Sequence, residues 1–172
     1  GLMDCQNLEI KLEEAPVRNC LPKVVIPVHL GGSSCDMKEI YSLSKKYGFS
    51  IIEDASHAVG GKYNNNYVGC CQHSSITVFS FHPVKIITSG EGGIATTNNE
   101  EIATKIRNLR SHGIIKDPAK FVFPCKGSWH YEQQSLGFNY RITDIQAALG
   151  LSQLNRLDKI VEERNAQLIF YK

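Results

Sequence analysis

The most constraining feature of the sequence is a strand–helix–strand pattern in its first third. Residues 23–30 form a nearly continuous apolar run, which is typical of a strand buried on both faces. A Gly-Gly-Ser-Ser turn follows, and residues 36–47 have the periodicity of an amphipathic helix that ends at Gly48. Residues 49–52 are a second apolar strand. Because strands joined in this way form a right-handed parallel crossover, the sequence predicts an α/β fold.

The rest of the chain extends this pattern into a mostly parallel sheet. Strands are predicted over 75–81 and 93–97. Residues 82–92, between them, are fewer than the dozen or more that a helical crossover needs, so we expect the last strand to run antiparallel. Helices are predicted over 7–15, 99–109 and 143–171, the last with an apolar stripe for core or dimer packing, and segment 111–138 is predicted to be a functional loop.

Composition and charge exclude several classes of protein. The chain has 172 residues, 42% of them hydrophobic, which is enough for a sizeable core. A formal net charge of +2 gives no electrostatic reason to expect binding to nucleic acid or to an anionic membrane. No apolar run reaches membrane-spanning length. The six cysteines are scattered, so we expect no disulfide framework and a reducing, cytoplasmic setting.

Polar residues follow three of the predicted strands. His29 follows the first strand, Asp54 and His57 follow the second, and Ser80 and Lys85 follow the third. Because ligands of open α/β sheets bind outside the carboxyl ends of the strands, we expect an acid, a hydroxyl and a lysine to converge on one crevice. A lysine can form a Schiff base with a carbonyl, and a carboxylate can hold a protonated ring nitrogen. Pyridoxal phosphate requires both groups.

Five short motifs give the chain a family resemblance. The motifs are Glu53-Asp54-Ala55-Ser56-His57-Ala58, Ser80-Phe81-His82-Pro83-Val84-Lys85, Gly90-Glu91-Gly92-Gly93, Arg110-Ser111-His112-Gly113 and Gly137-Phe138-Asn139-Tyr140-Arg141. Together they resemble the DegT/DnrJ/StrS-type nucleotide-sugar aminotransferases, which have the type I aminotransferase fold and use pyridoxal 5'-phosphate. Within the family the resemblance is greatest to the pseudaminic-acid pathway, whose transaminases carry an amino group from glutamate to C4 of a UDP-linked 4-keto-6-deoxy-N-acetylhexosamine. It covers nearly the whole chain, with residues 114–135 the poorest match.

The resemblance implies a role for each matching residue. Lys85 matches the Schiff-base lysine, which also carries the proton between the substrate carbon and the cofactor, and Asp54 matches the partner of the pyridinium nitrogen. His57 matches a position near the cofactor's ring hydroxyl, and Ser80 matches a phosphate-binding hydroxyl. Asn139 matches a residue that reaches the cofactor phosphate of the partner subunit, which implies a homodimer with shared active sites.

His112 and Arg141 lie in family motifs and are candidate substrate or interface contacts.

The resemblance also indicates which part of the family's large domain this sequence covers. Residues 1–172 match the central part of the large domain, so we expect the upstream phosphate-binding segment and the small C-terminal domain to lie outside this sequence. Many relatives have a larger residue at the position of Gly31.

Alternative interpretations of the crevice remain open. A non-catalytic α/β module could bind a ligand there for sensing or protein interaction, and a flavodoxin-like domain would not depend on Lys85. The presence of Lys85 argues against the related sugar dehydratases, in which the lysine is replaced. Cys70, Cys71 and His73 suggest zinc, but adjacent cysteines rarely present both sulfurs to one ion and no second ligand pair has suitable spacing. No metal site is therefore predicted.

Overall fold

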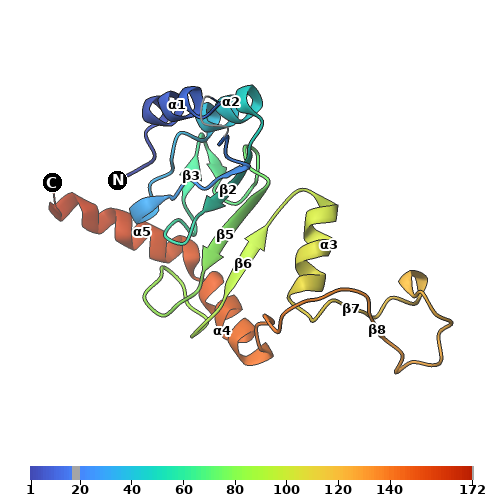
Figure 1. Cartoon of the computed structure of the whole chain (residues 1–172). Coiled ribbons are helices and arrows are strands. Elements are labelled where there is room, and N and C mark those ends of the chain that lie inside the picture. The colour runs from blue at the N-terminus through green and yellow to red at the C-terminus, as the bar shows by residue number, and fades with distance from the viewer. Residues whose placement is uncertain (17–19, 172) are drawn as a thin grey trace. The chain divides into compact units, whose positions relative to one another are not determined.

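The computed structural model describes residues 1–16 and 20–171 and divides into two units (Figure 1). The sheet unit comprises Gly1–Asn98 and Asp144–Lys172, and the loop unit comprises Asn99–Thr143. The sheet unit holds most of the regular structure, whereas the loop unit consists of one α-helix, a 3-10 turn, one antiparallel pair of short strands and irregular chain.

The sheet unit is built on four strands in the order β1-β2-β5-β6. These are β1 (Val24–Val25), β2 (Ser50–Asp54), β5 (Ile76–Ser80) and β6 (Gly93–Thr96). The pairs β1–β2 and β2–β5 are parallel, and β5–β6 is antiparallel. This arrangement confirms both the predicted crossover and the predicted reversal of the last strand.

The first predicted strand, residues 23–30, is regular only at Val24–Val25. Pro27 has no N–H to donate to a strand ladder, but its carbonyl accepts the Asp54 N–H at 2.9 Å. The His29 N–H in turn donates to the Asp54 carbonyl at 2.9 Å. The chain therefore follows β2 as far as His29, and this places the 3-10 turn η2 (Leu30–Gly32) beside the carboxyl end of β2.

Two helices form the first hydrophobic core with β1 and β2. Helix α1 (Cys5–Glu14) begins before its predicted start because Asp4, and not an asparagine, is its N-cap; Asp4 accepts the Asn7 N–H at 2.7 Å. Helix α2 (Met37–Tyr47) ends, as predicted, at Gly48 in the left-handed region, with φ 80°. The buried residues of this core are Leu12, Val25, Cys35, Met37, Ile40, Leu43, Phe49 and Ile51.

The predicted helix over 143–171 is two helices and a 3-10 turn: α4 (Asp144–Leu154), α5 (Leu157–Leu168) and η4 (Ile169–Tyr171). At the break, the Arg156 N–H donates to the Gln153 carbonyl at 3.0 Å, which closes a tighter turn than an α-helix. Side chains of α5 pack against a second core formed by Ala55, Ala58, Val59, Phe79 and Ile87. In α4, by contrast, Ile145 and Leu149 of the predicted stripe are exposed.

A small hairpin extends the loop that follows β2. Its strands are β3 (Lys62–Tyr63) and β4 (Asn66–Tyr67), paired antiparallel. Asn64 and Asn65 connect them with φ of 47° and 65°, a conformation that asparagine tolerates better than most residues.

The loop unit begins with α3 (Glu100–Leu109), which Asn99 caps by accepting the Ile102 N–H at 3.0 Å. Beyond it, the predicted irregular segment contains β7 (Ile114–Ile115) paired antiparallel with β8 (Glu132–Gln133), and the 3-10 turn η3 (Pro118–Lys120). The Glu132 carboxylate accepts the N–H groups of Val122 and Phe123 at 2.7 and 2.9 Å. This side chain holds an otherwise irregular loop together.

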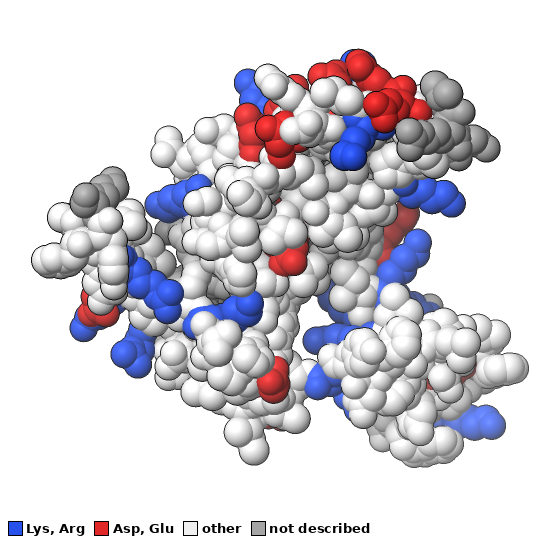
Figure 2. All heavy atoms as spheres, turned by 60° about the vertical axis from the view of Figure 1, so that its left-hand side comes forward, with Lys and Arg blue, Asp and Glu red and all other residues white. Residues whose placement is uncertain are grey.

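The distribution of surface charge and the apolar length of the helices agree with what the composition predicts. On the face drawn in Figure 2, acidic side chains gather mainly at the top, with basic ones beside them, and most of the remaining surface is uncharged. Within the described residues, none of the helices combines the length and apolar character that crossing a membrane requires.

Candidate functional site

The site lies at the carboxyl ends of β2 and β5. Asp54, the last residue of β2, is paired with Val28 on one side and Val78 of β5 on the other. Ser80 ends β5, and the chain from 81 to 92 then loops back to β6. The Phe81 carbonyl closes this loop by accepting the Ser89 N–H at 3.0 Å and the Thr88 hydroxyl at 2.9 Å. The loop that carries Lys85 is therefore anchored at its base.

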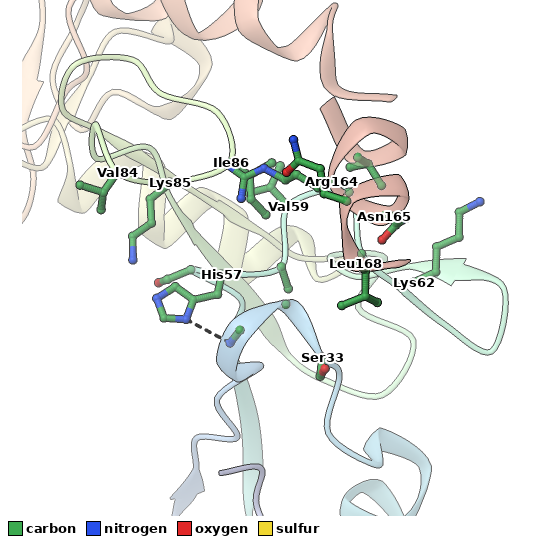
Figure 3. A pocket seen from close by; sticks show the side chains of 18 of the residues that line it. Ser33, His57, Val59, Lys62, Val84, Lys85, Ile86, Arg164, Asn165 and Leu168 are labelled. Atoms are coloured by element: carbon green, nitrogen blue, oxygen red, sulfur yellow. Dashed lines mark hydrogen bonds between the residues drawn. The ribbon is translucent and has the colours of Figure 1, made fainter. Parts of the chain in front are cut away.

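A groove of about 930 Å³ lies next to these strand ends (Figure 3). Three loops and the last helix line it. The contributing segments are residues 31–33, 56–62 and 84–86, together with residues of α5 and η4 that include Val161, Arg164, Asn165 and Leu168. The cationic side chains among the lining residues are those of Lys62, Lys85 and Arg164, and no Asp or Glu is among them.

Lys85 is the half-buried lysine of the groove. Figure 3 shows its side chain extending toward the same end of the groove as the His57 ring. In the described part of the chain, its ammonium group has no hydrogen-bond or ion-pair partner. The end of this side chain is therefore accessible to a ligand in the groove.

Asp54 and Ser80 lie at the strand ends and do not line the groove. Hydrogen bonding from Ser56, whose N–H lies 3.0 Å from Asp54 Oδ1, holds the pKa of Asp54 below its usual range against the opposing effect of burial. Attraction from Lys85 lowers the pKa of Asp54 further. Asp54 is therefore a carboxylate at neutral pH. The Ser80 hydroxyl accepts the His82 N–H at 3.4 Å.

His57 is held by the glycine turn. Its Nδ1 accepts the Gly31 N–H at 3.3 Å, drawn as a dashed line in Figure 3. Gly31 has φ 66°, a conformation that favours glycine, and a Cβ added there would meet no atom within 4 Å. The space next to Gly31 is thus open.

His29, the polar residue that follows the first predicted strand, is buried inside the sheet unit and does not line the groove. Its side chain is 0% exposed, and its Nε2 lies 2.8 Å from Glu53 Oε2. The Glu53 carboxylate also accepts hydrogen bonds from the hydroxyls of Thr77, at 2.8 Å, and Ser74. A buried carboxylate with three partners, and not solvent, decides where the imidazole points.

The protonation of the His29–Glu53 pair follows from its hydrogen bonds. Burial raises the pKa of Glu53, but hydrogen bonds from His29, Ser74 and Thr77 outweigh it, so this pKa lies below its usual range. Burial opposes a charge on the His29 ring, whereas its hydrogen bonds with Cys35 and Glu53 favour one. The contact at Nδ1 decides between them, because Nδ1 accepts the Cys35 N–H at 3.2 Å and a proton there would face that donor. We therefore assign a neutral ring with its hydrogen on Nε2, donated to Glu53.

Sequence reasoning assigned no role to Glu53, although a signal was present. In β2, Ile51 and Glu53 are buried and alternate with less buried neighbours. A carboxylate on the apolar face of a strand requires partners, and His29 and Thr77 are polar residues near the neighbouring strands.

His112, Asn139 and Arg141 belong to the loop unit. Within that unit the two family motifs around them come together: the His112 N–H donates to the Phe138 carbonyl at 2.9 Å, and Ser111 forms an antiparallel bridge with Asn139. His112 itself has φ 60°, which is uncommon outside glycine. The roles of these three residues stay predictions.

Cys70 and Cys71, two of the suggested zinc ligands, lie in different environments. Cys71 is buried, and its thiol donates to the Thr96 carbonyl at 3.2 Å, whereas Cys70 is exposed. Across residues 1–16 and 20–171, no three His, Cys, Asp or Glu side chains are grouped as a metal site would require.

Lys85 thus lines a groove next to the strand ends and attracts the ionised carboxylate of Asp54, which lies outside the groove lining. The model of the DegT/DnrJ/EryC1/StrS aminotransferase family matches residues 2–172. The chain belongs to this family. It is 43% identical over 164 residues to the UDP-4-amino-4,6-dideoxy-N-acetyl-beta-L-altrosamine transaminase of Campylobacter jejuni, an alignment that covers 95% of this chain and 41% of that protein.

Solved structures agree with the family assignment. Helicobacter pylori PseC, an aminotransferase involved in the biosynthesis of pseudoaminic acid, superposes with a TM-score of 0.77 at 36% identity, over 91% of this chain and 38% of that one. The PMP form of Spr1654 from Streptococcus pneumoniae gives a TM-score of 0.81 at 30% identity, over 99% and 45%. The predicted type I aminotransferase fold is confirmed, and the chain spans about two fifths of the length of the curated relatives it matches.

Proposed function

We propose that this chain supplies the catalytic lysine and the cofactor-binding carboxylate of a pyridoxal-phosphate-dependent nucleotide-sugar aminotransferase. The observation that carries the proposal is the unpartnered Lys85 ammonium, which shares one end of the groove with His57 and electrostatically attracts the ionised Asp54. Family membership supports the same chemistry.

The residues present fit this cofactor. A carboxylate that stays ionised at neutral pH can pair with a protonated pyridine nitrogen, and Asp54 is such a group. A groove of about 930 Å³ with three cationic lining residues suits an anionic ligand of this size. When bound, pyridoxal phosphate takes up the electrons released as a substrate C–H bond breaks.

Each side chain has a defined task in this proposal. Lys85 would hold the cofactor covalently through Nζ and, once free, would carry the proton to and from the substrate carbon. Asp54 would keep the ring nitrogen protonated. His57 would contact the ring hydroxyl, Ser80 would bind the phosphate, and Asn139 would reach the phosphate from the partner subunit of a homodimer.

The substrates follow from the named relatives. The Campylobacter jejuni relative is a transaminase of an altrosamine sugar nucleotide, and PseC is involved in pseudoaminic-acid biosynthesis. We accordingly propose a UDP-linked 4-keto-6-deoxy-N-acetylhexosamine as amino acceptor and glutamate as amino donor. His112 and Arg141 would contact the substrate or the subunit interface, and the enzyme would act in the cytoplasm.

The lysine provides the test. The full-length protein with the Lys85→Ala substitution should lose both the visible absorbance of lysine-bound pyridoxal phosphate and amino transfer from glutamate to the UDP-keto-sugar. Lys45→Ala, on the exposed surface of α2, should retain both and is the matched control. Activity in the Lys85→Ala protein would disprove the assignment. Cofactor binding by the unsubstituted protein without amino transfer would favour a non-catalytic binding module.

A further inference from the structure

The glycine turn between β1 and α2 is closed by one buried side chain. The Nδ1 of His29 accepts the Cys35 N–H at 3.2 Å, and the His29 carbonyl accepts the Gly32 N–H at 3.2 Å. The Cys35 thiol adds a hydrogen bond to the Val28 carbonyl at 3.3 Å. Hydrogen bonds to His29 and to its neighbour Val28 therefore hold both ends of the turn.

The same imidazole fastens this turn to the sheet. Its Nε2 donates to Glu53 at 2.8 Å, and Glu53 is fixed in turn by Thr77 of β5 and by Ser74. All of these contacts are shielded from water, because His29 and Thr77 are 0% exposed and Glu53 is 5% exposed. Buried, fully partnered hydrogen bonds of this kind are stronger than those at a surface. The position of the turn is therefore set by the interior of the sheet unit.

One donor that the turn presents to the groove is the Gly31 N–H. Gly31 is exposed, and its N–H lies 3.3 Å from His57 Nδ1. In a neutral imidazole, a nitrogen that accepts a hydrogen bond carries no hydrogen, so the ring hydrogen of His57 lies on Nε2. His57 therefore offers the groove a hydrogen-bond donor and not an acceptor.

We propose that His29 is a positioning residue of this site: it holds the glycine turn so that the Gly31 N–H meets His57 Nδ1, which fixes the ring and leaves Nε2–H facing the groove. His29 acts through Gly31 and does not touch the groove itself. The further consequence, that Nε2–H meets an acceptor on the cofactor, rests on the proposed function, whereas the positioning does not.

Two substitutions of His29 can separate the contact of its Nε2 with Glu53 from the contact of its Nδ1 with the Cys35 N–H. Glutamine in place of His29 puts its amide near the position of Nε2, so His29→Gln preserves a donor to Glu53 and removes the acceptor for the Cys35 N–H. Asparagine puts its amide near Nδ1, so His29→Asn preserves that acceptor and removes the contact with Glu53. Ser74→Ala is the matched control, because it removes a partner of Glu53 without touching the turn.

The measurement is amide hydrogen exchange at Gly31, by NMR of the full-length protein labelled with ¹⁵N-glycine and free of cofactor. Because Gly31 is exposed, His57→Phe should show the exchange rate without the Nδ1 acceptor, which we expect to be roughly 2- to 10-fold faster than in the unsubstituted protein. His29→Gln and His29→Asn should approach that rate, and Ser74→Ala should not. The ¹⁵N shifts of His57 should show hydrogen on Nε2 in the unsubstituted protein.

Two results would overturn the proposal. One is slow Gly31 exchange in a folded His29→Gln or His29→Asn protein, and the other is a ring hydrogen on Nδ1 of His57. If His29→Asn does not fold, His29→Gln alone decides, since it keeps the buried carboxylate partnered. Because cofactor is absent throughout, neither result depends on the aminotransferase assignment, which Lys85→Ala tests separately.

Discussion

Glu53 and Asp54 are consecutive residues of β2 whose carboxylates have separate partners. Glu53 is bound inside the sheet unit by His29, Ser74 and Thr77, whereas Asp54 is bound at the strand end by Ser56. Successive residues of a strand point to opposite faces, so one short segment supplies both an interior anchor and a group for the site. Substitutions at the two positions should therefore have different effects.

Asp54→Asn should reduce activity far more than stability. Asparagine can still accept the Ser56 N–H, so we expect the free energy of unfolding to change by less than about 1 kcal/mol. It cannot pair as an anion with a protonated ring nitrogen, so kcat should fall by roughly 10²-fold or more. Urea unfolding and steady-state kinetics of the full-length protein give the two numbers. A near-normal kcat would contradict the role assigned to Asp54.

Glu53 should make stability sensitive to acid. Its pKa is lower in the folded chain than its ordinary value of 4.5, so the stability that it contributes is present above about pH 4.5. This contribution is lost as the pH falls through the folded-state pKa. Between pH 6 and 3, the urea midpoint of Glu53→Gln should consequently fall less steeply than that of the unsubstituted protein. Parallel curves for the two proteins would show that Glu53 does not titrate in this way.

Gly113 should tolerate no side chain. It has φ 68°, and a Cβ there would collide with the Ser135 backbone. Gly90 also has a positive φ, 83°, but a Cβ there would meet no atom within 4 Å, which makes it the matched comparison. Gly90→Ala should cost about 1 kcal/mol of strain. Gly113→Ala should cost more and should increase proteolysis within residues 114–135. Equal sensitivity of the two variants to protease would refute the collision.

Asn139 can be tested by mixing subunits. If it completes the site of the partner subunit, Lys85→Ala and Asn139→Ala proteins are each inactive alone, but their hybrid dimer contains one site with both residues intact. Random exchange should then restore roughly a quarter of the unsubstituted activity. The activity of the re-formed mixture is the measurement. No recovery, with hybrid dimers shown to be present, would mean that Asn139 acts within its own subunit.

Local patterns in the sequence were sufficient for the sheet but not for every side chain. Runs of apolar residues and the length of segment 82–92 determine strand direction, so the parallel pairs and the reversed β6 could be predicted. Lys85 and His57 could be placed at the groove because they lie in the loops that follow β5 and β2. His29 follows a strand as well, but its orientation depends on a carboxylate on another strand, which no local pattern reveals.

The break between α4 and α5 was missed for a similar reason. The apolar stripe takes a five-residue step from Leu149 to Leu154, which does not fit one helical face, but each half alone has helical spacing. Packing of Leu157 against the second core sets the start of α5, and that core is assembled from strands distant in the sequence.

The empty space beside Gly31 bears on how this site can evolve. A substitution there must adopt a left-handed backbone, at a cost of about 1–2 kcal/mol, but its Cβ would meet no atom within 4 Å. A larger residue at position 31 could therefore narrow the groove without a change in the buried residues that support the turn. Under the proposed function, acceptor preference could thus change through position 31 while Lys85 and Asp54 are retained.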